Sequence, residues 1–229
     1  MLRRLIKASA IVVGVGLAVA ACSPVKMGAA AIVGNQRITI ATLDTEVTNL
    51  SQAAAQYPAA VSLTASQRTQ ATLTWLIRYQ IFEEMARQAG ITVSTAQGQK
   101  ALNQAVAAAE SAAEQQGLTN ATQTLILAAS GIPPNTSAEL GRYEAIASQY
   151  LTIANGGTAP AAGSAAQTAA GNKLNTAECQ AAKALNIAVN PQFGQLDYNG
   201  YQVVTAPSPV TRTQGPVKAA SPVATAPAC

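Results

Sequence analysis

Apolar residues recur at helical spacing through most of the chain between residues 40 and 185, and this pattern predicts a bundle of helices. It is clearest over residues 66–89, where we expect a helix with Ser66 as N-cap and Gly90 as its C-terminal stop. The stripe on this helix is wide and contains Leu73, Leu76, Ile77, Ile81, Met85 and Ala89. A stripe of this width predicts a central helix covered by several neighbours.

Weaker stripes of the same period predict further helices before and after the central one. The first follows a cap at Thr39 and ends by Pro58, and another is capped by Ser94 or Thr95 and runs to residue 116. The remaining stripes predict helices over residues 119–130, 137–154 (capped by Ser137) and 165–185.

Short extended segments flank the helical region. Residues 29–38 have β-type residues on both sides of Gly34-Asn35, two residue types that tolerate the positive φ of a tight hairpin turn. Residues 187–191 and 201–204 have the pattern of brief strands. Prolines recur without periodicity over residues 206–229, so we expect a disordered tail there.

Composition supports a mainly α fold and limits the partners. The apolar fraction is 49%, much of it alanine, whereas aromatic residues make up only 4%. Alanine is the best helix former, which favours packed helices over a β-sandwich. Three of the 14 basic residues precede residue 8, which leaves 11 basic against 10 acidic residues in the rest. A nearly neutral chain gives no reason to expect nucleic acid as a partner.

The N-terminus has the three zones of an exported protein. Residues 1–7 are basic, residues 8–21 are apolar, and the sequence then continues Val19-Ala20-Ala21-Cys22. The apolar stretch is shorter than the ~20 residues that a spanning helix needs. It predicts a signal peptide over residues 1–21. The alternatives are an ordinary secreted protein with a chance cysteine and an uncleaved anchor, and the agreement of all three zones favours a lipoprotein over both.

The ending of this segment resembles the lipobox of bacterial lipoproteins. The resemblance implies that the thiol of Cys22 receives a diacylglyceryl group and that residues 22–28 form a lipidated tether. We therefore expect the chain at the extracytoplasmic face of the cell membrane, held there through the lipid, because each buried methylene adds about 0.8 kcal/mol.

Two stretches carry a second resemblance. One is Ala31-Ile-Val-Gly-Asn-Gln-Arg-Ile-Thr39, and the other runs from Leu73 to Ser94 and contains Leu-Ile, an apolar pair, alanine, glycine and a capped helix. Together they resemble the SurA N-terminal chaperone domain, a helical module also found in PrsA-type foldases. In that family the N-terminal strand pairs with a returning segment, which residues 188–194 resemble.

This resemblance covers most of residues 29–204. It implies a helical SurA-N-like domain over residues 29–205, with a small β element formed by the N-terminal hairpin and the returning segment. A domain of this kind cradles extended, apolar, non-native polypeptide outside the cytoplasm. SurA and PrsA proteins usually also carry a parvulin-type prolyl isomerase domain, which typically uses histidines. The chain has no histidine, so isomerase activity is not implied.

The lack of histidine also excludes Ser-His and Cys-His nucleophile pairs and histidine-based metal sites. No GxSxG or GxxxxGK[ST] motif is present. Glu83 and Glu84 are adjacent on a predicted helix, so they diverge by about 100° and are interpreted as a solvated face. We therefore expect no enzyme, no metal and no cofactor. A deep pocket with two close carboxylates would instead favour an enzyme.

Two sets of residues are candidate sites. Cys179 and Cys229 would both lie outside the cell, where they form either a disulfide or two separate thiols. The aromatic residues Trp75, Tyr79 and Phe82 are candidates for a peptide-binding surface. An apolar stripe at helical spacing is, however, more commonly core.

These features predict a membrane-anchored, ATP-independent chaperone (holdase) whose partners are unfolded or exported polypeptides. The alternative is a non-catalytic interaction or scaffold lipoprotein that binds one specific partner in the cell envelope. A groove lined by exposed apolar residues would favour the chaperone. A closed, alanine-packed bundle would favour the alternative.

Overall fold

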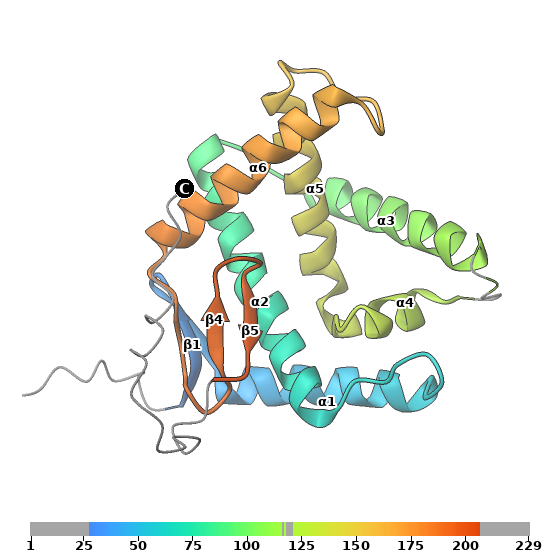
Figure 1. Cartoon of the computed structure of the whole chain (residues 1–229), viewed down its shortest axis with the longest axis vertical. Coiled ribbons are helices and arrows are strands. Elements are labelled where there is room, and N and C mark those ends of the chain that lie inside the picture. The colour runs from blue at the N-terminus through green and yellow to red at the C-terminus, as the bar shows by residue number, and fades with distance from the viewer. Residues whose placement is uncertain (1–27, 116, 118–120, 207–229) are drawn as a thin grey trace, which may run out of the picture.

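The computed structural model describes residues 28–115, 117 and 121–206 and confirms a mainly α fold with a small β element (Figure 1). The helices are α1 (Ile40–Gln56), α2 (Ala65–Ala89), α3 (Thr95–Gln115), α4 (Gln123–Ala129), the 3-10 turn η1 (Pro134–Thr136), α5 (Ser137–Ala154) and α6 (Ala165–Ala184). The strands are β1 (Ala29–Val33), β2 (Gln36–Thr39), β3 (Ala188–Val189), β4 (Gln195–Asp197) and β5 (Gln202–Val204). The signal peptide, Cys22 and the Pro-rich tail lie outside the described residues.

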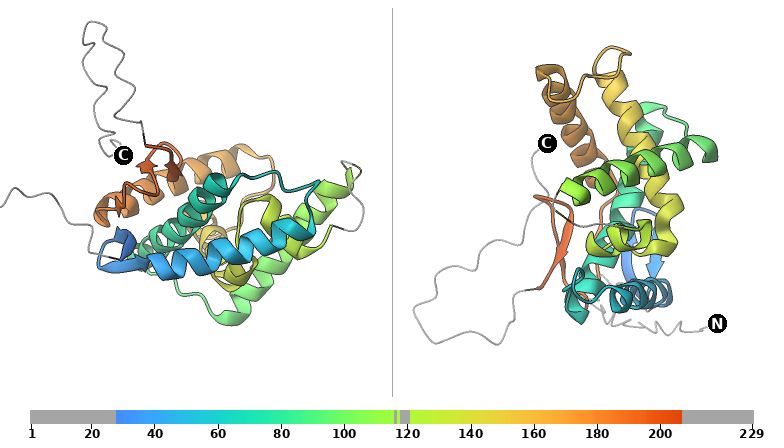
Figure 2. Two further views of the ribbon diagram at one scale, coloured as in Figure 1. Left: turned by 90° about the horizontal axis from the view of Figure 1, so that it is seen from below. Right: turned by 90° about the vertical axis from the view of Figure 1, so that its right-hand side faces the viewer.

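Helix α2 is central, as its wide apolar stripe predicts. It contacts α1, α5, α6, β1 and β5, and α1 lies across its N-terminal end (Figures 1 and 2). Its N-cap is Thr64 rather than the expected Ser66, because Thr64 and Gln67 form a capping box with two reciprocal hydrogen bonds. The C-cap is Gly90, as expected, with φ +66°.

The N-terminal hairpin is confirmed and pairs with the returning segment. β1 pairs antiparallel with β2 across a turn at Gly34, whose φ is +61°. β1 also pairs antiparallel with β3, which gives the strand order β2-β1-β3. Beyond β3, the backbone N–H of Asn190 donates to the carbonyl of Ala30 at 2.9 Å. The chain therefore returns to the N-terminal strand after the last helix.

A second, two-stranded sheet is formed by β4 and β5, which pair antiparallel. The sequence predicted β5 but not β4. The β4–β5 hairpin lies against α2, and the backbone N–H of Val203 donates to Oγ1 of Thr74 at 2.8 Å. This bond fixes β5 beside the N-terminal half of the central helix.

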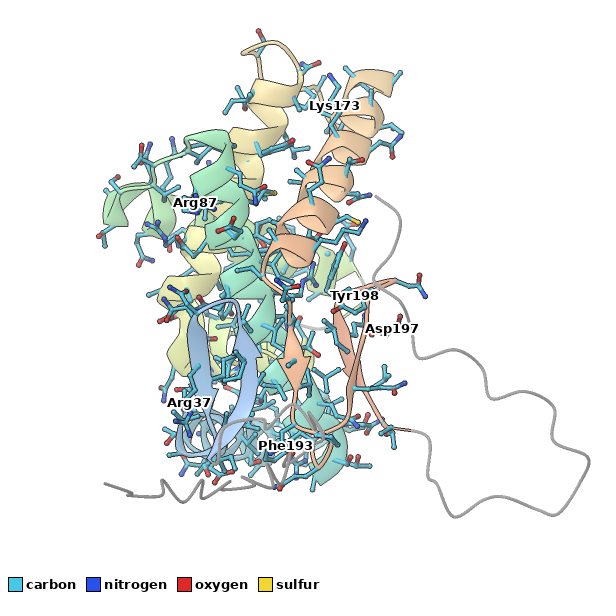
Figure 3. All side chains as sticks on the ribbon, turned by 90° about the vertical axis from the view of Figure 1, so that its left-hand side faces the viewer. Arg37, Arg87, Lys173, Phe193, Asp197 and Tyr198 are labelled. Carbon is cyan, nitrogen blue, oxygen red and sulfur yellow. The ribbon has the colours of Figure 1, made fainter. Side chains whose placement is uncertain are left out.

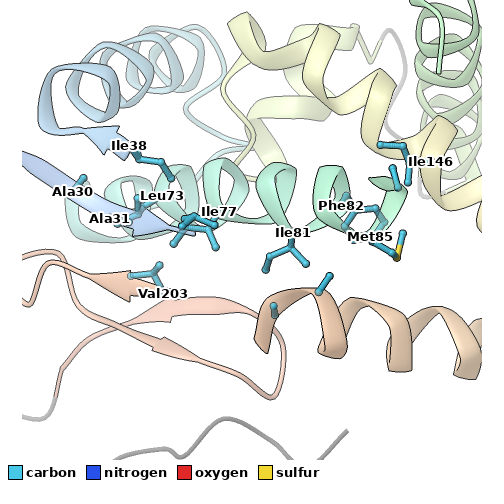
Figure 4. Packing of buried hydrophobic residues seen from close by; sticks show 14 of the residues in the cluster. Ala30, Ala31, Ile38, Leu73, Ile77, Ile81, Phe82, Met85, Ile146 and Val203 are labelled. Carbon is cyan, nitrogen blue, oxygen red and sulfur yellow. The ribbon is translucent and has the colours of Figure 1, made fainter. Parts of the chain in front are cut away.

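The core is built around α2 from small and medium-sized side chains (Figure 4). The three alanines at the start of β1 are fully buried, and Ala181 and Ala182 bury the facing side of α6. Alanine lets a strand and a helix approach α2 closely, but each alanine buries little apolar area. The main core therefore depends on the larger side chains of α2, among them Leu73, Ile77, Ile81, Phe82 and Met85.

Two boundaries differ from the expected ones. Helix α4 begins at Gln123 after the N-cap Thr122, so it is shorter than expected. Ser137 is the first residue of α5 rather than its cap, because the turn η1 leads directly into the helix. In the described part of the chain, no helix combines the length and the apolar character needed to span a membrane.

Candidate binding cleft on helix α2

A cleft of about 530 Å³ lies between α2, β5 and the end of α4. Its floor is one face of α2, where the lining residues follow helical spacing: Gln67, Gln70, Ala71, Thr74, Trp75 and Arg78. One wall is formed by residues 202–205 and the other by the exposed Ser130. Most of the lining side chains are amides and hydroxyls, so the cleft offers many hydrogen-bonding groups beside one large aromatic ring.

Side chains of α2 hold the β5 wall in place. Besides the bond from Val203 to Thr74, the side-chain amide Nε2 of Gln70 donates to Oγ1 of Thr205 at 3.0 Å. Two contacts from successive turns of α2 therefore hold the strand along the helix. The cleft is formed by the fold itself rather than by a loose segment.

Arg78 lies at the far end of the cleft. Its guanidinium is 5.0 Å from the ring centre of Trp75 and 5.6 Å from that of Tyr143, which are cation–π distances. It donates a hydrogen bond of 3.0 Å to the hydroxyl of Tyr143 on α5 and lies 3.9 Å from Oε1 of Glu178 on α6. Arg78 therefore joins the cleft to the packing of α5 and α6 against α2.

Two carboxyl groups interact electrostatically with this guanidinium: that of Glu178, which is buried, and that of Glu144, which is partly buried. Burial raises the pKa of Glu144 and of Glu178, while the charge of Arg78 acts in the opposite direction on both. Burial also raises the pKa of Tyr143 to about 12. Within the described part of the structure, Nε of Arg78 and Oε1 of Glu178 are buried without a hydrogen-bond partner. We call Arg78, Tyr143, Glu144 and Glu178 the polar cluster.

The β4–β5 hairpin covers one side of this cluster. Figure 3 shows Tyr198 at the turn of the hairpin, near the end of α6. The ring of Tyr198 lies 6.5 Å from that of Tyr201, whose φ is +50°. Burial raises the pKa of Tyr201 to about 12, and Glu178 contributes to this rise. The hairpin therefore brings Tyr201 close to Glu178 of the polar cluster, with Tyr198 beside it.

Only one of the three aromatic candidates, Trp75, lines the cleft. Its ring is 5.9 Å from that of Tyr79 and 5.7 Å from that of Tyr143. Tyr79 is only 6% exposed, bonds to Oγ1 of Thr136 at 3.1 Å and lines a separate small cavity of about 150 Å³. Phe82 is 1% exposed and belongs to the main core. For Tyr79 and Phe82 the interpretation as core is confirmed.

Cys179 is on α6, directly after Glu178, and is 8% exposed. It is disulfide-bonded. Both other cysteines, Cys22 and Cys229, lie outside the described residues. The pairing of Cys179 with Cys229 and the lipidation of Cys22 therefore stay predictions.

The carboxylates of Glu83 and Glu84 diverge, as expected for neighbours on a helix. Glu84 hydrogen-bonds to Arg87 and Gln88 of its own helix. Glu83 accepts two hydrogen bonds from Arg142 of α5, and its side chain is 39% exposed, so it belongs to a solvent-facing ion pair between the two helices. Glu83 and Glu139 line the 150 Å³ cavity together. Because Glu83 is held by Arg142, the two do not form a free acid–base pair.

The sequence did not identify the polar cluster. One signal was present: Arg78 is a charged residue that directly follows Ile77 of the apolar stripe on the central helix, three positions after Trp75. Glu144 and Glu178 give no comparable signal, because both reach Arg78 only after α5 and α6 pack on α2. Among the described residues, no group of three or more His, Cys, Asp or Glu could hold a metal ion.

Comparisons of the chain with protein-family models, curated proteins and solved structures find no match.

Proposed function

We propose that the chain is an extracytoplasmic lipoprotein, anchored to the cell membrane through Cys22, that binds extended polypeptide in the cleft on α2 without covalent chemistry. The observation that carries the proposal is the cleft itself, a preformed space of about 530 Å³. From Gln67 to Arg78 its floor is about 16 Å long, the length of about five residues of extended chain.

The lining suits a peptide backbone. An extended segment presents unpaired N–H and C=O groups, and side-chain amides such as those of Gln70 and Gln202 can donate to one and accept from the other. The half-buried ring of Trp75 offers an apolar surface between them. The resemblance to the SurA N-terminal domain also supports a role in binding non-native polypeptide.

Two forms of this function differ in their range of partners. A general holdase needs a broad apolar surface, whereas a protein with one dedicated partner uses specific polar contacts. Among the described residues, Ile153 is the single strongly exposed large hydrophobic side chain, with 55% exposure, and it lies outside the cleft. The polar lining therefore favours a dedicated envelope partner over a general holdase.

The test measures the binding of a permanently unfolded model protein to the soluble mature chain that carries Cys22→Ser. Binding is followed by the fluorescence emission of Trp75. This residue is the only tryptophan of the chain, so its emission reports on the cleft alone. We expect Gln202→Ala to weaken binding about 2–10-fold, the effect of one lost hydrogen bond. Gln104→Ala on the exposed face of α3 is the matched control and should leave binding unchanged.

The outcome separates the two forms. Binding together with suppressed aggregation of many clients, measured by light scattering, would favour the general holdase. Binding of a few segments without suppression would favour the dedicated partner. If Trp75 emission responds to no polypeptide, or if both variants bind equally well, binding in the cleft is wrong.

A further inference from the structure

We infer that the cleft on α2 recognises the free C-terminal carboxylate of an extended polypeptide, and that Arg78 is the residue that binds this carboxylate. The inference deepens the proposed function and rests on it, because it names the part of a polypeptide that enters the cleft. The bound chain lies along α2 from Gln67 towards Arg78, with its last residue beside the guanidinium.

Arg78 carries the single charge in the lining of the cleft, as far as the described residues extend. The other lining side chains are those of glutamine, threonine, serine, valine, alanine and one tryptophan, with no Asp, Glu, Lys or second Arg among them. A negatively charged group of a ligand is therefore attracted to this one position. The rest of the cleft offers hydrogen bonds without charge.

The carboxyl groups near Arg78 leave its charge available to a ligand. Oε1 of Glu178 lies 3.9 Å from Nη2, which is too far for a hydrogen bond, and this oxygen has no hydrogen-bond partner in the described part of the chain. Neither Glu178 nor Glu144 lines the cleft. Burial raises the pKa of both carboxyl groups, which favours their neutral forms.

The guanidinium also keeps a hydrogen-bond donor for a ligand. Nη2 donates to the hydroxyl of Tyr143 at 3.0 Å, whereas Nη1 makes no hydrogen bond to any described residue. The Arg78 side chain is 24% exposed and lines the cleft. Its contact with the ring of Trp75 and its bond to Tyr143 hold the guanidinium in one orientation. A guanidinium held in this way binds a carboxylate through charge-assisted hydrogen bonds, which are about twice as strong as neutral ones.

The fold closes the cleft at the Arg78 end. Tyr143 of α5 and Glu178 of α6 both lie against Arg78, and α6 crosses α2 beyond the β4–β5 hairpin (Figure 1). An extended chain that follows α2 therefore has to end at Arg78. At the other end of the cleft, Gln67 is exposed and lies in the first turn of α2, so a chain can enter there from solvent.

The closed end and the positive charge together select one kind of chain end. An unmodified N-terminus is an ammonium group, which Arg78 repels, whereas a C-terminus is a carboxylate, which it attracts. An internal Asp or Glu is attracted as well, but the chain would then have to continue into α5 and α6. A polypeptide has a single C-terminus, so recognition of this group favours one defined segment of a partner.

The experiment compares N-acetylated pentapeptide libraries without Trp or Tyr that end either in a carboxylate or in a carboxamide. Binding to the mature chain that carries Cys22→Ser is followed by the emission of Trp75. We expect the carboxylate library to bind about tenfold or more tightly than the carboxamide library, the effect of a hydrogen bond to a charged group. A third library, with Glu at its central position and a carboxamide end, should bind as weakly as the carboxamide library.

Two substitutions on α2 assign this preference to a residue. Arg78→Gln should bind the carboxylate and carboxamide libraries equally well, because the glutamine amide has no charge. Arg87→Gln, at the exposed end of the same helix, is the matched control and should keep the preference of the parent. Circular dichroism checks the fold of both variants. The comparison of the libraries in the parent chain needs no variant, so it tests the inference even if Arg78→Gln does not fold.

Equal binding of the carboxylate and carboxamide libraries to the parent chain would overturn the inference and leave the proposed function intact. Tight binding of the library with central Glu would overturn it in favour of an internal acidic side chain. A preference for the carboxylate that survives in Arg78→Gln would overturn the role of Arg78. If none of the libraries binds, the proposed function is contradicted together with the inference.

Discussion

Arg78 gives the cleft its charge. Its side chain packs well against aromatic rings, but part of its guanidinium is left without a hydrogen-bond partner. Its guanidinium contacts two aromatic rings and the hydroxyl of Tyr143, yet Nε is buried without a hydrogen-bond partner. A buried donor that remains unpaired costs about 1–3 kcal/mol. Glu178 carries a similar cost, since its buried Oε1 has only a distant charge partner. Such costs persist most often at functional sites.

The polar cluster predicts an unusual dependence of stability on pH. Because burial raises the pKa of Glu144 and Glu178 above the ordinary value of 4.5, the folded state binds protons more readily than the unfolded state. The free energy of unfolding should therefore increase as the pH falls from 7 towards 4.5. Chemical denaturation at several pH values measures it.

Glu178→Gln isolates the contribution of one carboxyl group. The amide cannot ionise, so this variant should be at least as stable as the parent at pH 7 and should gain less stability on acidification. Glu114→Gln, on an exposed part of α3, is the control and should keep the parent's slope. If the free energy of unfolding of the Glu178→Gln chain depends on pH in the same way as that of the parent, the raised pKa of Glu178 is contradicted.

At the level of helices and strands, the periodic apolar pattern located the long elements well. It placed α2, α3, α5 and α6 to within a few residues, and it anticipated both the N-terminal hairpin and the strand that returns to it. It missed β4, because Leu196 is the single apolar residue of this strand, whereas β5 contains the β-branched pair Val203-Val204. It also missed the cleft, which joins residues of α2, β5 and Ser130 that are far apart in sequence.

The crossing of α3 and α5 provides a test of the packing. Figure 2 shows the two helices crossing, and Gly98 faces Gly141 at the contact. A Cβ on Gly141 would lie 2.5 Å from the backbone oxygen of Gly98, so the helices must move apart to accept it. We expect Gly141→Ala to lower the free energy of unfolding by about 1–3 kcal/mol.

Gly171 is the matched control for this substitution. It is also a helical glycine, but a Cβ there would meet nothing within 4 Å. Gly171→Ala should raise the free energy of unfolding by about 0.5–1 kcal/mol, because alanine favours the helix. Thermal or chemical unfolding of the two variants measures the difference. Equal effects at both positions would show that α3 and α5 do not cross as closely as described.

For the whole molecule, the cleft uses no residue of β1, the strand at which the described chain begins (Figure 1). The cleft is lined instead by residues of α2, by residues 202–205 and by Ser130. The predicted lipid on Cys22 would thus hold the chain at the membrane without using any residue that lines the cleft. The export signal is predicted from local sequence, because its three zones are contiguous, and it stays a prediction. The cleft could not be predicted in this way, because it exists only in the assembled fold.

The most direct test of polypeptide binding in the cleft is site-specific photocrosslinking in intact cells. A photoreactive residue replaces Gln202 in the cleft wall or, as the control, Gln104 on α3, and mass spectrometry identifies the crosslinked peptides. We predict that position 202 gives defined crosslinks to an exported polypeptide. Position 104 should give none. Crosslinks that are the same from both positions, or none from position 202, would contradict the account.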